Sequence, residues 1–565
     1  MRMGIHSTIA FFITICAVQT WPQPAPQTAQ WVEFRSFHYS GKDPVAAEHP
    51  LPKDSYFNPI LAGFYADPSV ARVGDTFYLV NSSFSYFPGV PIFASKDLVH
   101  WNQLGHVLDR PDQLPLHGGV SRGIFAPTIR YNNGTFYMIT TLIDTTGNFY
   151  VTATNAAGPW SDPKPLPQVN GIDPSFFFDA DGNAYIVYNG PPPNNVSLYD
   201  GHRAIWEVCF ETASGKVTGT PKLLVNGGVD ITRKPSWIEG PHLLTRNGFY
   251  YLIAAEGGTA NQHSEVVFRS RSVEGPFVPF DGNPILSQRG LPADRPNPVT
   301  STGHADFVEA SDGQWWAVFL GCRPYAAHLY NTGRETFLLP VTWKNDWPLI
   351  LPAGEAVPRI VTKANLETES NAPPMTGSYT SDDSFDQSVL APQWQGLRTP
   401  SSTWWKLAHG LWLQPRAEDL QGNSDPSFLG RRQQHSDFEA STTLSTQSVV
   451  DATDAGLVAF QSEKDSFFLG ARIDKGCVQK IFLETTNEGV VTRSESTWTP
   501  KTKCTRDIDL KVTGAGADYS FYAREKGRKW LPIALHADGS ILSTAHAGGF
   551  VGTYLGMYAR LSSPK

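Results

Sequence analysis

The stretch Gly171–Tyr188 reads GIDPSFFFDADGNAYIVY. It has an apolar run, an Asp-Gly pair and a second run rich in aromatic residues, which is the strongest short-range signal of a β-hairpin. The stretch Tyr65–Val80, YADPSVARVGDTFYLV, repeats the same order. A hairpin that recurs within one chain predicts a repeat architecture.

The hairpin pattern occurs five times in the first two thirds of the chain. The copies begin at Ala66, Phe125, Ile172, Glu239 and Gly303. Further strand-like runs lie between the copies, and almost no segment sustains a helical period. Each copy therefore predicts a small antiparallel sheet, and a closed ring of five such sheets is a five-bladed β-propeller.

A second domain is predicted after the propeller. From about Ala372 the composition changes to a Pro- and Ser-containing stretch, and a new set of alternating strands follows it. We expect an all-β chain with a propeller over residues 55–357 and a β-sandwich over residues 375–565. Two domains are also the default for 565 residues.

The N-terminal 22 residues are typical of a secretory signal peptide. Arg2 precedes an apolar stretch from about Thr8 to Val18, and Pro-rich sequence follows. The sequence therefore predicts a secreted, extracellular protein. No other segment approaches the roughly 20 apolar residues that a membrane helix needs, so we expect no membrane partner.

Cysteines and glycosylation sequons fit that prediction. Four cysteines remain after the signal peptide: Cys209, Cys322, Cys477 and Cys504. The last two could form a disulfide, whereas pairing of the first two and two free thiols are equally compatible with the sequence. The sequons lie at Asn81, Asn133 and Asn195, and only the last two fall in obvious loops.

The composition indicates a neutral, polar ligand. A net charge of −8 with scattered basic residues argues against nucleic acid as a partner. Aromatic residues make up 12% of the chain and charged residues only 17%, which suits flat apolar surfaces that bind sugars.

Three acidic residues lie at the heads of the repeats. Asp67, Asp173 and Glu239 begin hairpins, whereas Ala126 and His304 stand at the heads of the other two copies. An Asp before Pro-Ser is also a common turn former, so each acid alone has a structural alternative. The first strand of every blade lines the central channel, so the ring brings the three acids together. Close carboxyl groups push their pKa values apart, as glycoside hydrolysis requires.

A set of motifs resembles glycoside hydrolase family 43. The motifs include NPILAGFYADPSVAR, IFAPTIRY, IDPSFFFD, IEGPHLL, TGHADFV and GRETFLLPVTW, and they extend from about Asn58 to Pro352. The resemblance implies a five-bladed propeller that acts as a β-xylosidase, an α-L-arabinofuranosidase or an arabinanase. LGRRQQHSDFEAST, in the second domain, resembles the concanavalin A-like β-sandwich that closes one side of the pocket in many members.

The resemblance also implies roles for the three acids. Asp67 matches the general base, Glu239 the general acid, and Asp173 the residue that orients the acid and raises its pKa. The family inverts the anomeric configuration, so the two reacting carboxyl groups should flank the sugar with room for a water molecule.

Further matches suggest substrate-binding residues, each with an alternative. Arg334 resembles an arginine that reaches sugar hydroxyls, but it could instead pair with Glu335. Phe84 resembles a pocket aromatic, but it could be an ordinary core residue. His304 resembles a channel histidine that contacts a water molecule or a bound calcium ion, but it could be a core histidine.

Two more aromatic residues are assigned by the resemblance. Phe125 stands where many xylosidase-like relatives have Trp, which leaves the substrate preference open. Phe550 is the candidate contribution of the second domain to the pocket, although core packing is the more common role of such a residue.

Three other functions fit the sequence less well. GVSRG at Gly119–Gly123 matches a serine-esterase motif, but a strand-like run follows it where a helix is needed. A metallohydrolase lacks its helical His pair and Cys-x-x-Cys spacing. A non-catalytic carbohydrate-binding propeller would not need all three acids.

We therefore expect a secreted, inverting exo-glycosidase that removes single pentoses from xylan-derived oligosaccharides or polysaccharides. β-Xylosidase is the first candidate, α-L-arabinofuranosidase the second and endo-arabinanase the third. No cofactor is required, a structural Ca²⁺ ion is compatible with the resemblance, and the sequence makes no prediction of oligomeric state.

Overall fold

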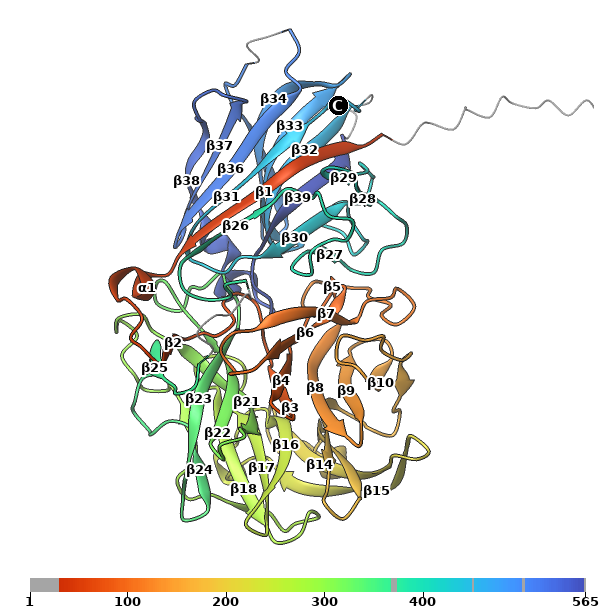
Figure 1. Cartoon of the computed structure of the whole chain (residues 1–565), viewed down its shortest axis with the longest axis vertical. Coiled ribbons are helices and arrows are strands. Elements are labelled where there is room, and N and C mark those ends of the chain that lie inside the picture. Colours follow the sequence, from red (N-terminus) through yellow and green to blue (C-terminus); the bar gives the residue numbers. More distant parts are fainter. Residues whose placement is uncertain (1–29, 367–372, 450–451, 500–502, 563–565) are drawn as a thin grey trace, which may run out of the picture.

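The chain forms two β domains stacked along the long axis of the molecule (Figure 1). The computed structural model describes residues 30–366, 373–449, 452–499 and 503–562. The propeller is at one end and the sandwich at the other. The predicted signal peptide, residues 1–22, lies outside the described residues.

The propeller has five blades whose strands follow one another in chain order. The first contains β3 (Ser69–Val73), β4 (Thr76–Val80), β6 (Gly89–Ser95) and β7 (Asn102–Leu108). The second contains β8 (Ile124–Asn132), β9 (Thr135–Leu142), β10 (Gly147–Ala153) and β11 (Lys164–Pro165). The third contains β12 (Ile172–Phe178), β13 (Ala184–Gly190), β14 (Ala204–Glu211) and β15 (Lys216–Asn226).

The last two blades complete the ring. The fourth contains β16 (Glu239–Arg246), β17 (Phe249–Glu256), β18 (Ser264–Ser270) and β19 (Val278–Pro279), with β20 (Leu286–Ser287) added to β18. The fifth contains β21 (Thr300–Glu309), β22 (Trp315–Cys322), β23 (Glu335–Lys344) and β24 (Trp347–Leu349). The predicted five-bladed propeller is thus confirmed.

The innermost strands close into a ring around one channel. β3, β8, β12, β16 and β21 contact one another in that order, and β21 contacts β3. The segment before β3 fastens the last blade to the first, because the Ile60 N–H donates to Thr336 O (2.9 Å) and the Tyr65 N–H donates to Arg334 O (3.0 Å). Strand heads far apart in sequence therefore meet at the channel.

The second domain is the predicted sandwich of two antiparallel sheets. The first sheet contains β26 (Tyr379–Asp383), β28 (Trp405–Leu407), β29 (Leu411–Leu413), β1 (Val32–Lys42), β31 (Asp437–Ser445), β36 (Asp507–Ala515), β37 (Asp518–Glu525) and β38 (Leu531–Asp538). The second contains β35 (Val490–Glu495), β34 (Cys477–Asn487), β33 (Asp465–Asp474), β32 (Thr453–Ser462), β39 (Tyr554–Leu561), β30 (Phe428–Arg432), β27 (Gln395–Leu397) and β5 (Tyr86–Phe87).

Little regular structure lies outside these sheets in the described residues. β2 (Ser55–Phe57) pairs with β25 (Ile360–Thr362), and the α-helices α1 (Pro44–Glu48) and α2 (Thr544–Ala547) are short. Neither described helix is long and apolar enough to cross a membrane.

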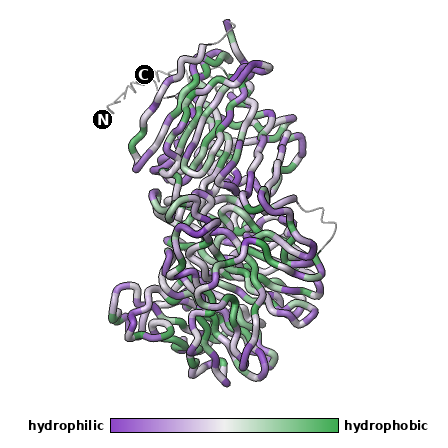
Figure 2. Tube along the Cα trace, turned by 90° about the vertical axis from the view of Figure 1, so that its left-hand side faces the viewer, coloured by the Kyte–Doolittle hydropathy of each residue, from purple (hydrophilic) through white to green (hydrophobic). Residues whose placement is uncertain are grey.

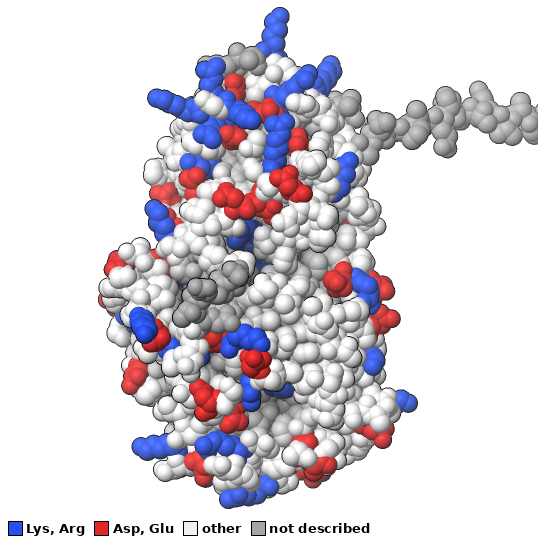
Figure 3. All heavy atoms as spheres, viewed as in Figure 1, with Lys and Arg blue, Asp and Glu red and all other residues white. Residues whose placement is uncertain are grey.

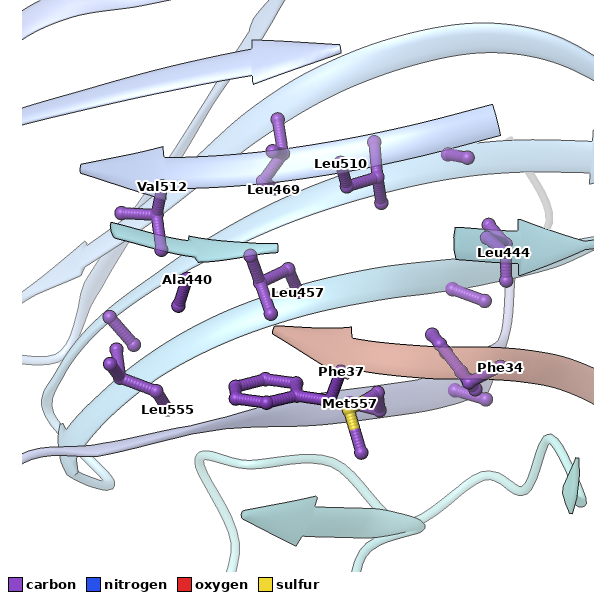
Figure 4. Close-up of a cluster of buried hydrophobic side chains, with 14 of the residues drawn as sticks. Phe34, Phe37, Ala440, Leu444, Leu457, Leu469, Leu510, Val512, Leu555 and Met557 are labelled. Atoms are coloured by element: carbon purple, nitrogen blue, oxygen red, sulfur yellow. The ribbon is translucent and has the colours of Figure 1, made fainter. Parts of the chain in front are cut away.

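The N-terminal strand β1 belongs to the sandwich, which the sequence did not indicate. It pairs with β26, β29 and β31. Phe34 and Phe37 of β1 point into the sandwich core beside Leu444 and Met557 (Figure 4). From β1 onward the chain therefore passes from the sandwich to the propeller and then returns to the sandwich.

The two domains also share a buried apolar cluster. Tyr86 of β5, which lies between the propeller strands β4 and β6 in the chain, stacks on Tyr554 of β39 with ring centroids 3.7 Å apart. Phe64, Phe84 and Phe428 belong to the same cluster, and apolar segments run through the interior of both domains (Figure 2). Burial of this surface holds the sandwich in a fixed position against the propeller.

Covalent and surface features agree with most of the sequence predictions. Cys477 and Cys504 form a disulfide, whereas Cys209 and Cys322 are free. The Asn81 side chain is fully buried and donates to Ala66 O (3.1 Å), so this sequon is not accessible in the fold. On the face shown in Figure 3, basic side chains are interspersed with acidic ones.

Candidate functional site

The residue at the head of every blade has a backbone φ in the left-handed region. The five residues are Asp67 (φ 50°), Ala126 (φ 36°), Asp173 (φ 53°), Gly240 (φ 58°) and His304 (φ 53°). The first four each precede a proline, and His304 precedes Ala305. A left-handed backbone is costly for residues other than glycine, and such strain is concentrated at functional sites.

This repeated position corrects the expected alignment of the acids. Glu239 was expected to occupy the same place as Asp67 and Asp173, but that place in the fourth blade belongs to Gly240. A Cβ atom on Gly240 would lie 2.8 Å from the His304 ring. Position 240 therefore has no room for a side chain, and the acid of the fourth blade stands one residue earlier, at Glu239.

A pocket of about 580 Å³ opens at these strand heads. Its lining includes all the predicted side chains, namely Asp67, Asp173, Glu239, Arg334, Phe84, Phe125, His304 and Phe550. The three carboxyl groups are each at most 8% exposed. The ring geometry therefore brings together acids as far apart along the chain as Asp67 and Glu239.

Asp67 is surrounded by groups that favour its ionised form. Arg334 Nη1 donates to Asp67 Oδ1 (3.2 Å), Ser82 Oγ donates to Oδ2 (2.6 Å), and His304 Nδ1 lies 3.9 Å from Oδ1. Burial alone would raise the pKa of Asp67, but the charges of Arg334 and His304 and the Ser82 hydrogen bond outweigh it and lower that pKa. Asp67 is therefore ionised near neutral pH.

Arg334 does not form the alternative surface ion pair with Glu335. Glu335 is fully buried and pairs with Arg323, whose Nε lies 2.6 Å from Glu335 Oε2. Arg334 is itself 8% exposed and faces the pocket. The sequence interpretation that placed Arg334 in the pocket agrees with this geometry.

Glu239 and Asp173 lie in the opposite electrostatic environment. Burial raises the pKa of Glu239 to about 8, with a further contribution from the negative charge of Asp173, and Arg334 opposes the shift. Burial also raises the pKa of Asp173, whose Oδ2 accepts from the Gly240 N–H (3.3 Å). At neutral pH the pocket therefore holds an ionised Asp67 and a Glu239 that keeps its proton.

An aromatic wall stands beside Asp67. Phe84 lies 5.2 Å from Phe125 and 5.9 Å from Phe550, measured between ring centroids. The guanidinium carbon of Arg334 lies 5.2 Å from the Phe550 ring. Phe84 is 2% exposed and also belongs to the interdomain cluster, so both interpretations of that residue apply. Phe550 shows that the sandwich contributes to the pocket.

The segment GVSRG joins the two domains. Ser121 Oγ accepts a hydrogen bond from the Phe550 N–H (3.0 Å) and thus fixes the loop that carries Phe550. Its neighbour Arg122 lines the pocket and pairs with Asp144 at the rim. The serine lies in a loop of an all-β fold, which excludes the nucleophile elbow of an α/β esterase.

Arg203 and Trp237 are among the pocket residues that sequence reasoning missed. The Arg203 guanidinium carbon lies 5.0 Å from the Trp237 ring centroid, and both side chains line the pocket. Arg203 follows a loop in the third blade, and Trp237 lies two residues before Glu239 in PSWIEGP. The proximity of Trp237 to a predicted acid was the one signal in the sequence that could have revealed it.

The residues around His304 do not fit a calcium site. Calcium takes six to eight oxygen ligands. Next to His304, burial lowers the pKa values of His242 and His263 to about 3, so both offer only neutral nitrogen. The carboxylate of Asp306 is already held by Arg130 (2.7 Å). In the described part of the chain, no group of three His, Cys, Asp or Glu side chains is arranged to hold a metal.

Comparison with known protein families agrees with both domains. The model of glycosyl hydrolases family 43 matches residues 56–348. The model of the beta xylosidase C-terminal concanavalin A-like domain matches residues 382–564. Together they cover the propeller and most of the sandwich.

Individual relatives match over almost the whole chain. A xylosidase/arabinosidase of Butyrivibrio fibrisolvens is 39% identical over 89% of this chain and 95% of its own length. A non-reducing end alpha-L-arabinofuranosidase of Bacteroides ovatus is 36% identical over 90% of this chain and 92% of its own. The crystal structure of a GH43_12 protein from a capybara gut metagenome is 38% identical, with a TM-score of 0.87 over 94% of this chain and all of the other.

Proposed function

Because the chain belongs to glycosyl hydrolases family 43, we propose that it is a secreted, inverting exo-glycosidase that removes terminal pentoses from xylan-derived material. The observation that carries the proposal is the division of the pocket, where the pKa of Asp67 is lowered and that of Glu239 is raised. The apolar segment near the N-terminus supports secretion.

In this proposal Asp67 is the general base and Glu239 the general acid. Ionised Asp67 takes a proton from a water molecule as the water oxygen attacks the anomeric carbon. The bond to the leaving oxygen breaks, its electron pair stays on that oxygen, and the proton of Glu239 neutralises it. Attack opposite the leaving group inverts the anomeric carbon. Asp173 keeps Glu239 protonated, because a nearby negative charge disfavours a second one.

The pocket shape supports removal of a single end sugar. Phe550 of the sandwich narrows one side of the pocket, and Arg334 presents a guanidinium that can donate to sugar hydroxyls. β-1,4-Xylosidase activity on xylo-oligosaccharides is our first candidate. α-L-Arabinofuranosidase activity is the second, and it is favoured by the 36% identity to the Bacteroides ovatus enzyme of that name.

Product analysis tests this proposal. We expect hydrolysis of nitrophenyl β-D-xyloside, of nitrophenyl α-L-arabinofuranoside or of both, and the ratio of kcat/KM values ranks the two candidates. Proton NMR during the first minutes should show the inverted anomer of the released pentose. Release of the retained anomer would overturn the inverting mechanism. Absence of turnover with both pentosides and with branched arabinoxylan, combined with sugar binding, would support a non-catalytic propeller instead.

A further inference from the structure

The general acid marks one side of the pocket as the leaving-group side. Its proton must reach the oxygen that is expelled, so the sugar attached to that oxygen lies next to Glu239. The opposite side, beside Asp67, is occupied by Arg334 and the aromatic wall of Phe84 and Phe550. This reasoning rests on the proposed function, because it uses the roles of the two acids.

Trp237 is a pocket residue whose side chain is partly open to solvent. It precedes Glu239 by two residues, lines the pocket and is 39% exposed. Its φ of 50° is an outlier for a bulky aromatic residue, and such strain persists where the surroundings impose it. An exposed indole in a strained backbone at the mouth of a sugar pocket suggests a binding role.

The backbone around Trp237 holds the ring in place. The Trp237 N–H donates to Gly201 O (2.9 Å). Gly201 has a φ of 77°, and a Cβ atom there would lie 2.8 Å from Ser236 Oγ and 3.3 Å from Trp237 Cδ1. Glycine at position 201 thus permits the close approach of the Trp237 loop, which fixes the indole before any ligand arrives.

Arg203 supplies hydrogen-bond donors beside this ring. Its guanidinium lies 5.0 Å from the Trp237 ring centroid, a cation–π distance, and its Nε donates to Asn189 Oδ1 (2.6 Å). Among the described residues, its two terminal nitrogens make no hydrogen bond. Arg203 lies within electrostatic reach of both Asp173 and the general acid Glu239.

We propose that Trp237 and Arg203 form the subsite for the sugar on the leaving-group side of the cleaved bond. The apolar face of a neutral pyranose stacks on the open face of the indole, and the terminal nitrogens of Arg203 donate to its hydroxyl groups. Gly258 and Thr259, in the loop after β17, also line the pocket. The substrate class is thus an oligosaccharide with a pyranose next to the scissile bond.

The Trp237→Ala variant tests this subsite with two leaving groups, one with a sugar ring and one without. Xylobiose or an arabinofuranosyl-xylose disaccharide expels a ring, whereas the matching methyl pentoside expels methanol. Both leaving oxygens need protonation by Glu239. We expect kcat/KM to fall about 10- to 100-fold for the disaccharide and no more than about threefold for the methyl pentoside. Trp237→Phe should recover part of the loss, because a smaller ring still stacks.

A matched control removes an equally exposed aromatic residue elsewhere on the propeller. Tyr131 is 38% exposed and does not line the pocket, so Tyr131→Ala should leave both rates unchanged. Equal losses of Trp237→Ala on both substrates would show that Trp237 acts by placing Glu239, and this would overturn the subsite. Unchanged rates on both substrates would overturn it as well.

A binding measurement separates this inference from the proposed function. In the Glu239→Gln background, calorimetry with xylobiose and with xylose needs no turnover. We expect Trp237→Ala to weaken xylobiose binding about tenfold and to leave xylose binding unchanged. Equal affinities of the two variants for xylobiose would refute the subsite even if the pentosides are hydrolysed, whereas failure of the wild type to hydrolyse any pentoside would refute the proposed function alone.

Discussion

Asp67 and Glu239 are buried almost equally, at 6% and 8% exposure, yet their pKa values move in opposite directions. Around Asp67, Arg334 and His304 offset the cost of burying a charge. Around Glu239, the nearby carboxyl group of Asp173 adds to that cost. Burial is therefore common to both halves of the pocket, and the neighbouring charges decide which acid carries the proton.

The order of blades in the ring creates this difference. Asp67 comes from the first blade, and its partner Arg334 immediately precedes β23 in the fifth, which closes against the first. Asp173 and Glu239 come from the third and fourth blades, which are also neighbours. A propeller can thus hold a cation–anion pair on one side of its channel and a carboxyl pair on the other.

Exchange of either acid for its amide should have the largest effect. We expect Asp67→Asn and Glu239→Gln each to lower kcat by about 10³-fold on xylobiose, because each removes a proton-transfer group. The two variants should respond differently to a substrate with a fluoride leaving group, because fluoride needs no proton to leave. A pentosyl fluoride should restore most of the rate of Glu239→Gln but not of Asp67→Asn. Restoration in both variants, or in Asp67→Asn alone, would contradict the assigned roles.

Exchange of Asp173 for Asn should make Glu239 lose its proton at a lower pH. The wild type should lose activity as the pH rises through about 8, where Glu239 ionises. Asp173→Asn removes a negative charge, so the pKa of Glu239 falls and the basic limb of the pH profile moves to lower pH. We expect a loss of about 10- to 100-fold at pH 7 and a smaller one at pH 5. An unshifted basic limb would show that Asp173 does not control Glu239.

Removal of Arg334 should destabilise the ionised form of Asp67, the proposed general base. Arg334→Met leaves Asp67 buried without its cation, so the pKa of Asp67 rises and the acidic limb moves to higher pH. Because Arg334 also lowers the pKa of Glu239, the basic limb should move in the same direction. We expect a loss of about 10- to 30-fold in kcat/KM at pH 7, from one charge-assisted hydrogen bond. A uniform loss without a shift of either limb would indicate a role in sugar binding alone.

Much of this pocket was predictable from the sequence because hairpin signals are local. Gly-containing turns between apolar runs, mostly Asp-Gly or Asn-Gly, predicted five blades, and the ring then implied that Asp67, Asp173 and Glu239 meet. The one-residue offset of Glu239 was not predicted, because it depends on the His304 ring that excludes a side chain at Gly240. The contact between Gly240 and His304 joins the fourth and fifth blades, so the sequence pattern of neither blade alone predicts it.

Contacts between distant segments explain the other omissions. β1 reads as an ordinary alternating strand, and only its pairing with β31, about 400 residues later, assigns it to the sandwich. Arg203 and Trp237 belong to different blades, and their stacking depends on Gly201 and on the loop before β16. A local pattern gives the type of an element, whereas partners this distant are fixed only by the packed fold.

Exchange of Phe550 should have the smallest effect and should test whether the sandwich takes part in binding. Phe550 is the sandwich's aromatic contact with the Asp67 half, where it lies 5.2 Å from the Arg334 guanidinium and 5.9 Å from Phe84. Phe550→Ala removes one wall of the pocket without removing a proton-transfer group, so we expect KM to rise about three- to tenfold and kcat to change less than about threefold. Both limbs of the pH profile should stay in place, since no charge is changed. Leu535→Ala, which removes a sandwich side chain that is 50% exposed and outside the pocket lining, should leave KM unchanged. A fall in kcat as large as that of Arg334→Met would mean that Phe550 positions Arg334 against Asp67 instead of contacting the sugar.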